Sequence, residues 1–204
     1  RGAILDELLP LKLTYGAIEG TERLRGNITS LYARQKPENV TVTHGAIGAN
    51  ALVYATLVEP GDRVISVLPT YQQHYSIPES LGADVQILKL REENAFLPDL
   101  DEIARLITPN TKLIVITNPN NPTGAVMDRA MMQRIADMAA QVGAYVLCDE
   151  VYRGVDQVGD ELTVSMADLY ERGISTRSMS KAFSLARLRL GWIVGAKQLI
   201  HAVS

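Results

Sequence analysis

One lysine, Lys181, stands in the stretch SMSKAFSLARLRLGW (178–192), directly after a short run of small and β-branched residues. Ser178 and Ser180 crowd it, so we expect its amine to be partly withdrawn from water. Withdrawal from water favours the neutral amine, which is nucleophilic enough to form a Schiff base with an aldehyde. The alternative is a lysine in a surface loop, which is the ordinary interpretation of the remaining lysines: Lys12, Lys36, Lys89, Lys112 and Lys197.

An anion site is predicted beside this lysine. Arg189 follows it and lies next to Gly191. A guanidinium group binds a phosphate dianion through two parallel hydrogen bonds, and the Ser178 hydroxyl can donate to the same anion. A second anion-binding element is HGAIGAN (44–50), where small residues open a predicted helix and leave backbone N–H groups free. The turn residues concerned there are Gly45, Ala46 and Ile47.

Asp149 lies in LCDEVYRG, at the end of an apolar run. A carboxylate buried there requires a positive partner, and a protonated pyridine nitrogen would serve. Tyr152 follows within one turn and could donate to a phenolate oxygen. The competing interpretation is that Asp149 caps a helix while Tyr152 packs in the core.

Two further segments carry polar or aromatic groups after predicted strands. NPNNPTG (118–124) is a rigid turn, because each proline fixes φ, and it presents the amide of Asn121, which could donate to a ring oxygen. Tyr71, in LPTYQQHY, could stack on a planar heterocycle, or could instead be a core tyrosine. Taken together, these motifs supply an aldehyde-capturing amine, a pyridinium counterion, a phosphate cradle, a stacking ring and a phenolate donor, which is the set that pyridoxal 5′-phosphate requires.

The elements that must position these groups alternate along the chain. We predict strands at 40–43, 62–69, 84–90, 112–119, 144–150, 174–180 and 191–196, and helices at 48–57, 71–82, 97–107 and 127–142. Such alternation predicts a three-layer αβα fold around a mainly parallel sheet of about seven strands. Ligands bind beyond the carboxyl ends of the strands in this architecture, and each motif above follows a predicted strand.

The composition excludes several classes of protein. The chain has 204 residues, 47% of them hydrophobic, and a net charge of −3. It therefore lacks the excess of positive charge that is typical of nucleic-acid-binding proteins. Its single cysteine, Cys148, provides neither a disulfide framework nor a zinc cluster, so we predict no metal. No apolar run approaches the ~18 residues of a membrane span, and the N-terminus does not resemble a secretory signal. We therefore expect a cytoplasmic protein.

The motifs TNPNNPTG, CDEVYRG and SMSKAFSLARLRLGW, in this order along the chain, resemble the class I/II aminotransferases, which are pyridoxal-phosphate enzymes of the aspartate aminotransferase fold type I. This resemblance implies that Lys181 forms the Schiff base and shuttles the proton at Cα. It implies that Asp149 keeps the pyridine nitrogen protonated and that Tyr152 and Asn121 bind the ring O3′.

The resemblance also implies which residues contact the ring face and the phosphate of the cofactor. Tyr71 matches the stacking aromatic residue, and the phosphate ligands it implies are Gly45, Ala46, Ile47, Ser178 and Arg189. Tyr15 matches a tyrosine that reaches the phosphate of a neighbouring subunit, which implies a homodimer with shared active sites. Arg187 departs from the family, which usually has glycine there, and its side chain would either crowd the site or point to solvent.

The family is about twice as long as this chain. We therefore expect an N-terminal loop and helix (1–35), a pyridoxal-phosphate-binding large domain (36–204) and no C-terminal small domain. The implied function is transfer of an amino group from an amino acid to a 2-oxo acid. A β-lyase, a decarboxylase and a non-catalytic cofactor-binding domain remain alternatives; a nucleotide-binding domain is disfavoured because GxGxxG and GxxxxGK[ST] are missing.

Overall fold

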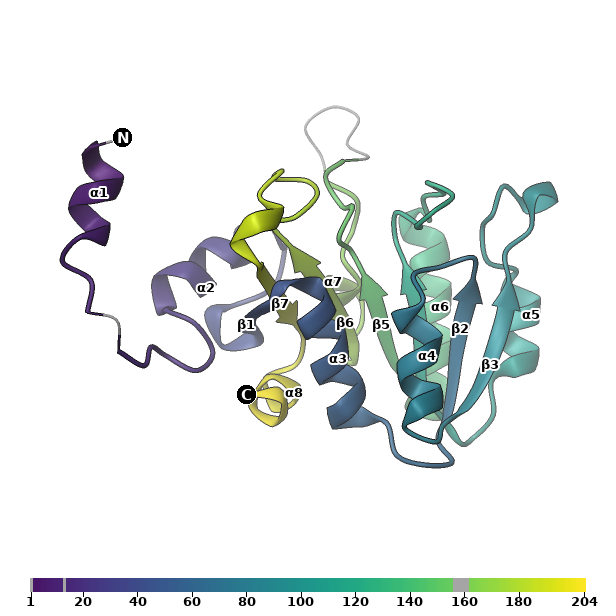
Figure 1. Ribbon diagram of the computed structural model, residues 1–204. Coiled ribbons are helices and arrows are strands. Elements are labelled where there is room, and N and C mark those ends of the chain that lie inside the picture. The colour runs from purple at the N-terminus through teal and green to yellow at the C-terminus, as the bar shows by residue number, and fades with distance from the viewer. Residues whose placement is uncertain (1, 13, 156–161) are drawn as a thin grey trace.

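The fold is built on one seven-stranded sheet (Figure 1). The computed structural model describes residues 2–12, 14–155 and 162–204. The strand order is β1-β7-β6-β5-β4-β2-β3, and β7 alone among these seven runs antiparallel to its neighbours. The strands are β1 (Val40–His44), β2 (Arg63–Leu68), β3 (Asp84–Lys89), β4 (Thr111–Thr117), β5 (Tyr145–Asp149), β6 (Gly173–Ser178) and β7 (Leu190–Val194).

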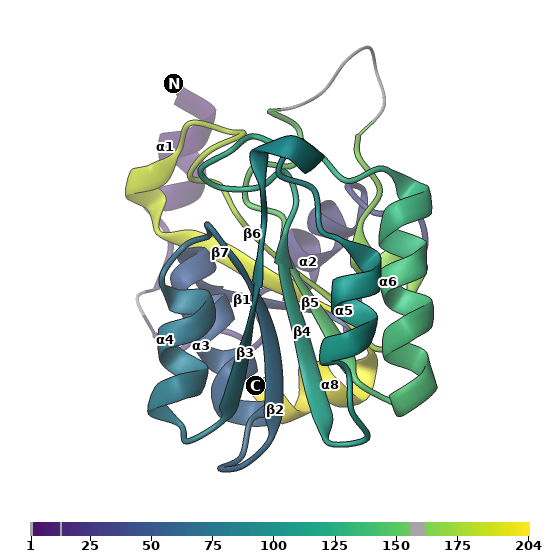
Figure 2. The same ribbon diagram turned by 90° about the vertical axis from the view of Figure 1, so that its right-hand side faces the viewer.

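Helices cover both faces of the sheet, as Figure 2 shows most clearly. One face carries α3 (Gly45–Leu57), α4 (Gln73–Ser80) and α8 (Lys197–Val203), and the other carries α2 (Glu22–Thr29), α5 (Leu100–Leu106), α6 (Arg129–Val142) and α7 (Met166–Leu169). Three 3₁₀ turns, η1 (Pro37–Asn39), η2 (Glu92–Asn94) and η3 (Ala186–Leu188), and the terminal helix α1 (Gly2–Leu8) complete the described elements. The predicted three-layer αβα fold is confirmed, and the predicted strands and helices are recovered with shifted ends.

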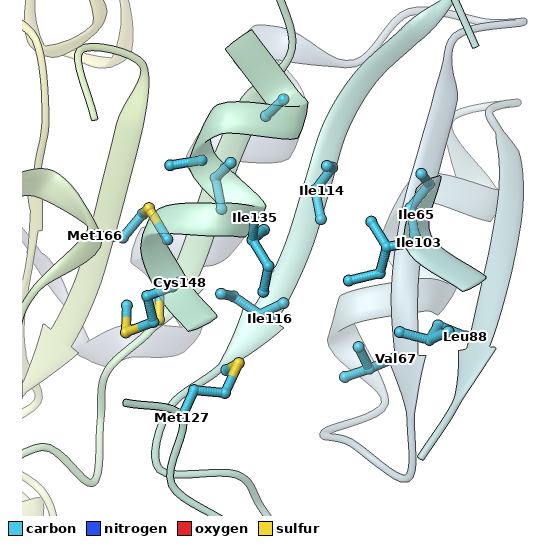
Figure 3. Close-up of a cluster of buried hydrophobic side chains, with 14 of the residues drawn as sticks. Ile65, Val67, Leu88, Ile103, Ile114, Ile116, Met127, Ile135, Cys148 and Met166 are labelled. Carbon is cyan, nitrogen blue, oxygen red and sulfur yellow. The ribbon is translucent and has the colours of Figure 1, made fainter. Parts of the chain in front are cut away.

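The position of β4 between two layers of helices explains the continuous apolar run in its sequence. Successive side chains of a strand point to opposite faces, so Leu113 and Val115 pack beneath α3, whereas Ile114 and Ile116 pack beneath α6. Figure 3 shows the second of these layers, with Ile135 of α6 lying against the two isoleucines. Both faces of the strand are buried, so neither has room for a polar residue.

Helix α6 illustrates how local signals set the bounds of an element. The Asp128 side chain accepts a hydrogen bond from the backbone N–H of Met131 and caps the start of the helix. Its end is set by Gly143, which adopts the left-handed conformation with φ 69°. Between them Met132, Ile135, Ala136 and Ala139 are buried, at the spacing of a single helical face.

A buried carboxyl group ties the loop after β5 to the neighbouring elements. Glu150 accepts hydrogen bonds from the Ser165 hydroxyl (2.8 Å), the Met166 backbone N–H (2.8 Å) and the Ser175 hydroxyl (2.8 Å). Arg153 lies 3.9 Å from it. Burial raises the pKa of Glu150, although the charge of Arg153 acts in the opposite direction. The group therefore holds together α7, β6 and the segment that follows Asp149.

Replacing Glu150 with alanine is expected to lower the free energy of unfolding by about 3–5 kcal/mol, because several buried donors and a buried guanidinium lose their acceptor. Urea unfolding monitored by circular dichroism measures the change. Glu150→Gln is the matched variant, and it should also flatten the pH dependence of stability. Because the native carboxyl has a raised pKa, its contribution to stability declines as pH rises from the ordinary glutamate range through the native value. An alanine variant as stable as the parent would contradict this role.

The N-terminal segment lies apart from the body of the fold (Figure 1). Helix α1 has no buried residue, and the apolar side chains Ile4, Leu5, Leu8, Leu9 and Leu11 are exposed. Residues 2–12 and 14–18 are called the N-terminal arm below. Across the described ranges, no helix combines the length and the apolar character needed to cross a membrane.

Candidate active site

The chemically capable residues gather at one edge of the sheet. Parallel strands β2, β4, β5 and β6 end at this edge, and the antiparallel β7 starts there. A cleft of about 220 Å³ opens at this edge, and its walls include Ala46, Ile47, Asn50, Tyr71, Thr117, Asn121, Asp149, Val151, Tyr152, Ser178, Ser180, Lys181 and Arg189. The structure thus brings together nine of the predicted site residues, contributed by segments far apart in the sequence.

A larger hollow of about 530 Å³ lies elsewhere, beside η2 and α5. Its walls include Lys89, Arg91 and Arg134 together with acidic residues, and none of the predicted site residues lines it. The cleft at the strand ends is therefore the candidate active site, because it combines an amine, a buried carboxylate and a helix N-terminus.

One end of the cleft is formed by the turn from β1 into α3 and by the start of β7. Gly45 has φ 71°, and a Cβ atom on it would lie 2.6 Å from a terminal nitrogen of Arg189. A Cβ on Gly191 would lie 2.3 Å from the carbonyl carbon of Gly45. Both glycines are therefore needed for the close approach of the two segments. The approach places the Arg189 guanidinium next to the N-terminus of a 13-residue helix, which is a favourable arrangement for an anion.

The opposite wall of the cleft contains the buried carboxylate of Asp149, which is 4% exposed. Its Oδ1 accepts a hydrogen bond from the backbone N–H of Val151 (3.0 Å). Its Oδ2 accepts from Asn50 Nδ2 (3.0 Å) and from His74 Nε2 (3.1 Å). Burial of an unpaired carboxylate would be unfavourable, and these donors offset that penalty. Asp149 therefore does not cap a helix, which was the competing interpretation; its side chain closes a short turn at Val151.

A second layer of side chains supports His74, which is completely buried. Its Nδ1 lies 2.8 Å from the Tyr54 hydroxyl. Burial, together with the nearby charge of Asp149, raises the pKa of Tyr54 well above its ordinary value, so the hydroxyl keeps its proton. Because a carboxylate can only accept, Nε2 of His74 donates to Asp149, and Nδ1 is hydrogen-bonded to the Tyr54 hydroxyl. The relay fixes the orientation of the imidazole and, through it, that of the carboxylate.

The remaining walls carry aromatic rings and the amine. Tyr71 is 43% exposed and contacts His74 edge to face, with the ring centroids 6.1 Å apart. The Nζ of Lys181 lies 5.6 Å from the centroid of the Tyr152 ring, within the range of a cation–π contact. Asn121 lines the same cleft, whereas the neighbouring Asn120 braces the turn by donating to the Pro69 carbonyl (3.3 Å).

The structure corrects one expectation from the sequence, decides one open alternative and leaves one prediction untested. Lys181 is exposed rather than partly withdrawn from water, and residues 183–189 of the same loop are exposed as well. Arg187 is also exposed and does not line the cleft, so its side chain points to solvent instead of crowding the site. Tyr15 is fully exposed on the N-terminal arm and does not line the cleft of its own chain.

Several cleft residues were missed by the sequence reasoning. Thr117, Val151 and Ser180 lie within the quoted motifs but were not predicted as site residues, because their residue types did not indicate a contact with a ligand. Asn50 and His74 were detectable in principle. Asn50 is a polar residue within an apolar helix, and His74 stands one helical turn after Tyr71, but neither spacing indicates a contact with Asp149.

Comparison with known proteins identifies the family. Residues 11–204 match the family described as aminotransferase class I and II. The chain belongs to this family. It is 37% identical over 167 residues to an aspartate aminotransferase from Pyrococcus horikoshii, covering 82% of this chain and 43% of that protein. It is 31% identical over 203 residues to an arginine–pyruvate transaminase from Pseudomonas aeruginosa, covering 97% of this chain and 52% of that protein.

Solved aminotransferase structures share the fold. A PLP-dependent aminotransferase from Streptococcus suis superimposes with a TM-score of 0.94 at 46% identity, covering 99% of this chain and 53% of that one. An aspartate aminotransferase from Thermus thermophilus gives a TM-score of 0.86 at 27% identity, covering 93% and 51%. The chain therefore spans about half the length of the relatives it matches, and the half that it spans has the fold of the aminotransferase large domain.

Class I and II aminotransferases depend on pyridoxal 5′-phosphate, and the cleft fits this cofactor. Gly45 and Gly191 let the Arg189 guanidinium approach the N-terminus of α3 closely, which suits a phosphate group. Asp149 is held by donors on both oxygens and lies in the wall of the cleft, where it suits a cationic ring nitrogen. Lys181 and Tyr71 line the same cleft.

Proposed function

We propose that this protein moves an amino group from an amino acid to a 2-oxo acid. When bound, pyridoxal 5′-phosphate supplies an aldehyde that captures the amine and a protonated ring that accepts electrons. The observation that supports the proposal is the joint presence of Lys181 and the buried Asp149 in one cleft whose other end is an anion cradle. The names of the relatives, aspartate aminotransferase and arginine–pyruvate transaminase, favour amino transfer.

Each residue has one proposed role. Lys181 would hold the cofactor through a Schiff base of its amine and would carry the proton at Cα, and Asp149 would stabilise a protonated ring nitrogen. Tyr152 and Asn121 donate to the ring oxygen, and Tyr71 stacks on the ring. The phosphate ligands are the helix N-terminus at Gly45, Ala46 and Ile47, with Ser178 and Arg189.

The proposal is tested by adding pyridoxal 5′-phosphate to the purified chain. We expect an absorbance band above 400 nm, and borohydride reduction should fix the cofactor to the peptide that contains Lys181, which mass spectrometry identifies. Incubation with a panel of amino acids then separates the reactions, because amino transfer yields pyridoxamine phosphate whereas a lyase or decarboxylase regenerates the aldehyde. A chain without the band and without a fixed adduct would not bind the cofactor, and the proposal would fail.

We also propose that the protein acts as a homodimer in which Tyr15 reaches the phosphate of the neighbouring subunit. Supporting this, Tyr15 is fully exposed on an arm whose apolar side chains have no cover from the described part of the same chain. The domain division proposed from the sequence, 1–35 and 36–204, gives this arm to the first part. A cytoplasmic location is proposed as well, since the one cysteine, Cys148, is a buried free thiol.

Deleting residues 1–18 is expected to convert a dimer into a monomer, because the exposed apolar side chains of the arm would be its contact surface. Sedimentation velocity measures the change. Tyr15→Phe is the matched variant: it should remain dimeric and bind pyridoxal 5′-phosphate roughly tenfold more weakly, since one hydrogen bond to a charged group is lost. Unchanged assembly in the deletion variant, with unchanged affinity in Tyr15→Phe, would contradict the shared site.

A further inference from the structure

A buried amide, Asn50, joins the two ends of the candidate site. It lies on α3, one turn beyond the anion-binding turn, and is 1% exposed. Its Nδ2 donates to Asp149 (3.0 Å) and to Gln73 Oε1 (3.3 Å), and its Oδ1 accepts from the Thr176 hydroxyl (2.7 Å). Nitrogen and oxygen of the amide both have partners, although burial of an amide inside an apolar helix face is unfavourable without them.

Thr176 holds the end of the Asn50 amide that faces away from the carboxylate. Asp149 and Thr176 are paired across the parallel strands β5 and β6, and Asn50 approaches the pair from α3. The buried Thr176 hydroxyl donates to Oδ1, and the NH₂ group faces Asp149. A reversed amide would place Oδ1 against the Asp149 carboxylate and repel it. The carboxylate therefore sets the orientation of the amide, and a hydroxyl that does not line the cleft helps to hold it there.

The same network reaches the anion cradle. Gln73 accepts from Asn50 and donates through Nε2 to the backbone carbonyl of Ile47 (2.8 Å). Hydrogen bonds therefore run continuously from the turn at Ile47 to the carboxylate of Asp149. The distance between phosphate and ring nitrogen is fixed in a pyridoxal-type ligand, so a rigid link between the two ends of the cleft helps to match it.

We propose that Asn50, held in place by Thr176, is a positioning residue that directs the Asp149 carboxylate into the cleft, toward a cationic ring nitrogen. The inference rests on the proposed function. Asn50 does not act alone, because His74 and the Val151 backbone also donate to Asp149. The titratable and charged side chains that face this part of the cleft are Tyr54, Tyr71, His74, Tyr152, Lys181 and Arg189.

The test is a pH titration of the absorbance above 400 nm, with pyridoxal 5′-phosphate added to the parent chain and to Asn50→Leu. Leucine has a similar size and cannot donate. A positive charge on the ring nitrogen opposes protonation of the nearby nitrogen that Lys181 contributes. An Asp149 that is held less well stabilises the ring charge less, and the opposition to protonation becomes weaker. We therefore expect the midpoint of the titration to rise by about one pH unit, the size of one charge-assisted hydrogen bond.

Two further variants make the result decisive. Thr176→Val should shift the midpoint in the same direction by a smaller amount, and it decides the question if Asn50→Leu does not fold. Gln73→Leu is the matched control, which should weaken cofactor affinity and leave the midpoint near that of the parent. If the parent shows no band, the proposed function fails; if it shows the band and Thr176→Val and any folded Asn50→Leu keep its midpoint within ~0.2 units, this inference fails.

Discussion

Lys181→Ala is expected to abolish covalent capture of pyridoxal 5′-phosphate and to slow the half-reaction with an amino acid by on the order of 10⁴-fold. Two contributions are lost together. The amine that forms the Schiff base is removed, and so is the group that carries the Cα proton. Among the residues that the structure describes, Lys181 is the one lysine that lines the cleft, so no other lysine of that set is placed to replace it. Single-turnover absorbance measurements and mass spectrometry after borohydride reduction report the two losses separately.

Lys197→Ala is the matched control for this prediction. Lys197 is an exposed lysine at the start of α8, and it does not line the cleft. Its variant should keep both the reducible adduct and the parental rate. An adduct that survives in Lys181→Ala, or one that disappears in Lys197→Ala, would show that the cofactor is captured by another amine.

The sequence predicts the fold well because its signals are local. Residues 113–116 in the middle of β4 are all apolar, since both faces of the strand are covered there. Helix α6 ends at Gly143, because glycine readily adopts the left-handed conformation found at that position. The start of α3 was predicted too late, at 48 instead of Gly45. Glycine and alanine at that position carry no helical pattern, and only the contact with Arg189 and Gly191 explains why the turn is so tight.

The candidate site is only partly predictable, for a physical reason. Residues that follow strands are brought to one edge by the topology, so Asp149, Asn121 and Lys181 could be grouped without a structure. No comparable rule predicts the hydrogen bonds made by side chains in the middle of a helix. Asn50 and His74 reach Asp149 because α3 and α4 pack at particular rotations against the sheet, and no spacing in the sequence encodes that rotation. The exposure of Lys181 was missed likewise, because several of its neighbours are apolar in the sequence and yet are themselves exposed: Phe183, Leu185 and Leu188.

Asp149→Ala is the second substitution with a large expected effect, and it should leave capture by Lys181 intact. Burying a cationic ring nitrogen without its carboxylate costs about 3–5 kcal/mol. If that cost falls mainly on the step in which the ring accepts electrons, the rate of Cα proton release falls by about 10²–10⁴-fold. The measurement is the rate of pyridoxamine phosphate formation in a single turnover, with borohydride fixation as the separate readout for Lys181.

Glu150, the next residue, provides a control that distinguishes the loss of a carboxylate inside the cleft from the loss of a carboxylate outside it. Both carboxyl groups are buried at the end of β5, but Asp149 lines the cleft and Glu150 bonds to Ser165, Met166 and Ser175 on the other face of the sheet. Glu150→Gln should therefore retain the parental rate. Equal losses in the two variants would mean that proton release responds to the stability of the loop after β5, and the assignment of Asp149 to the ring nitrogen would then be wrong.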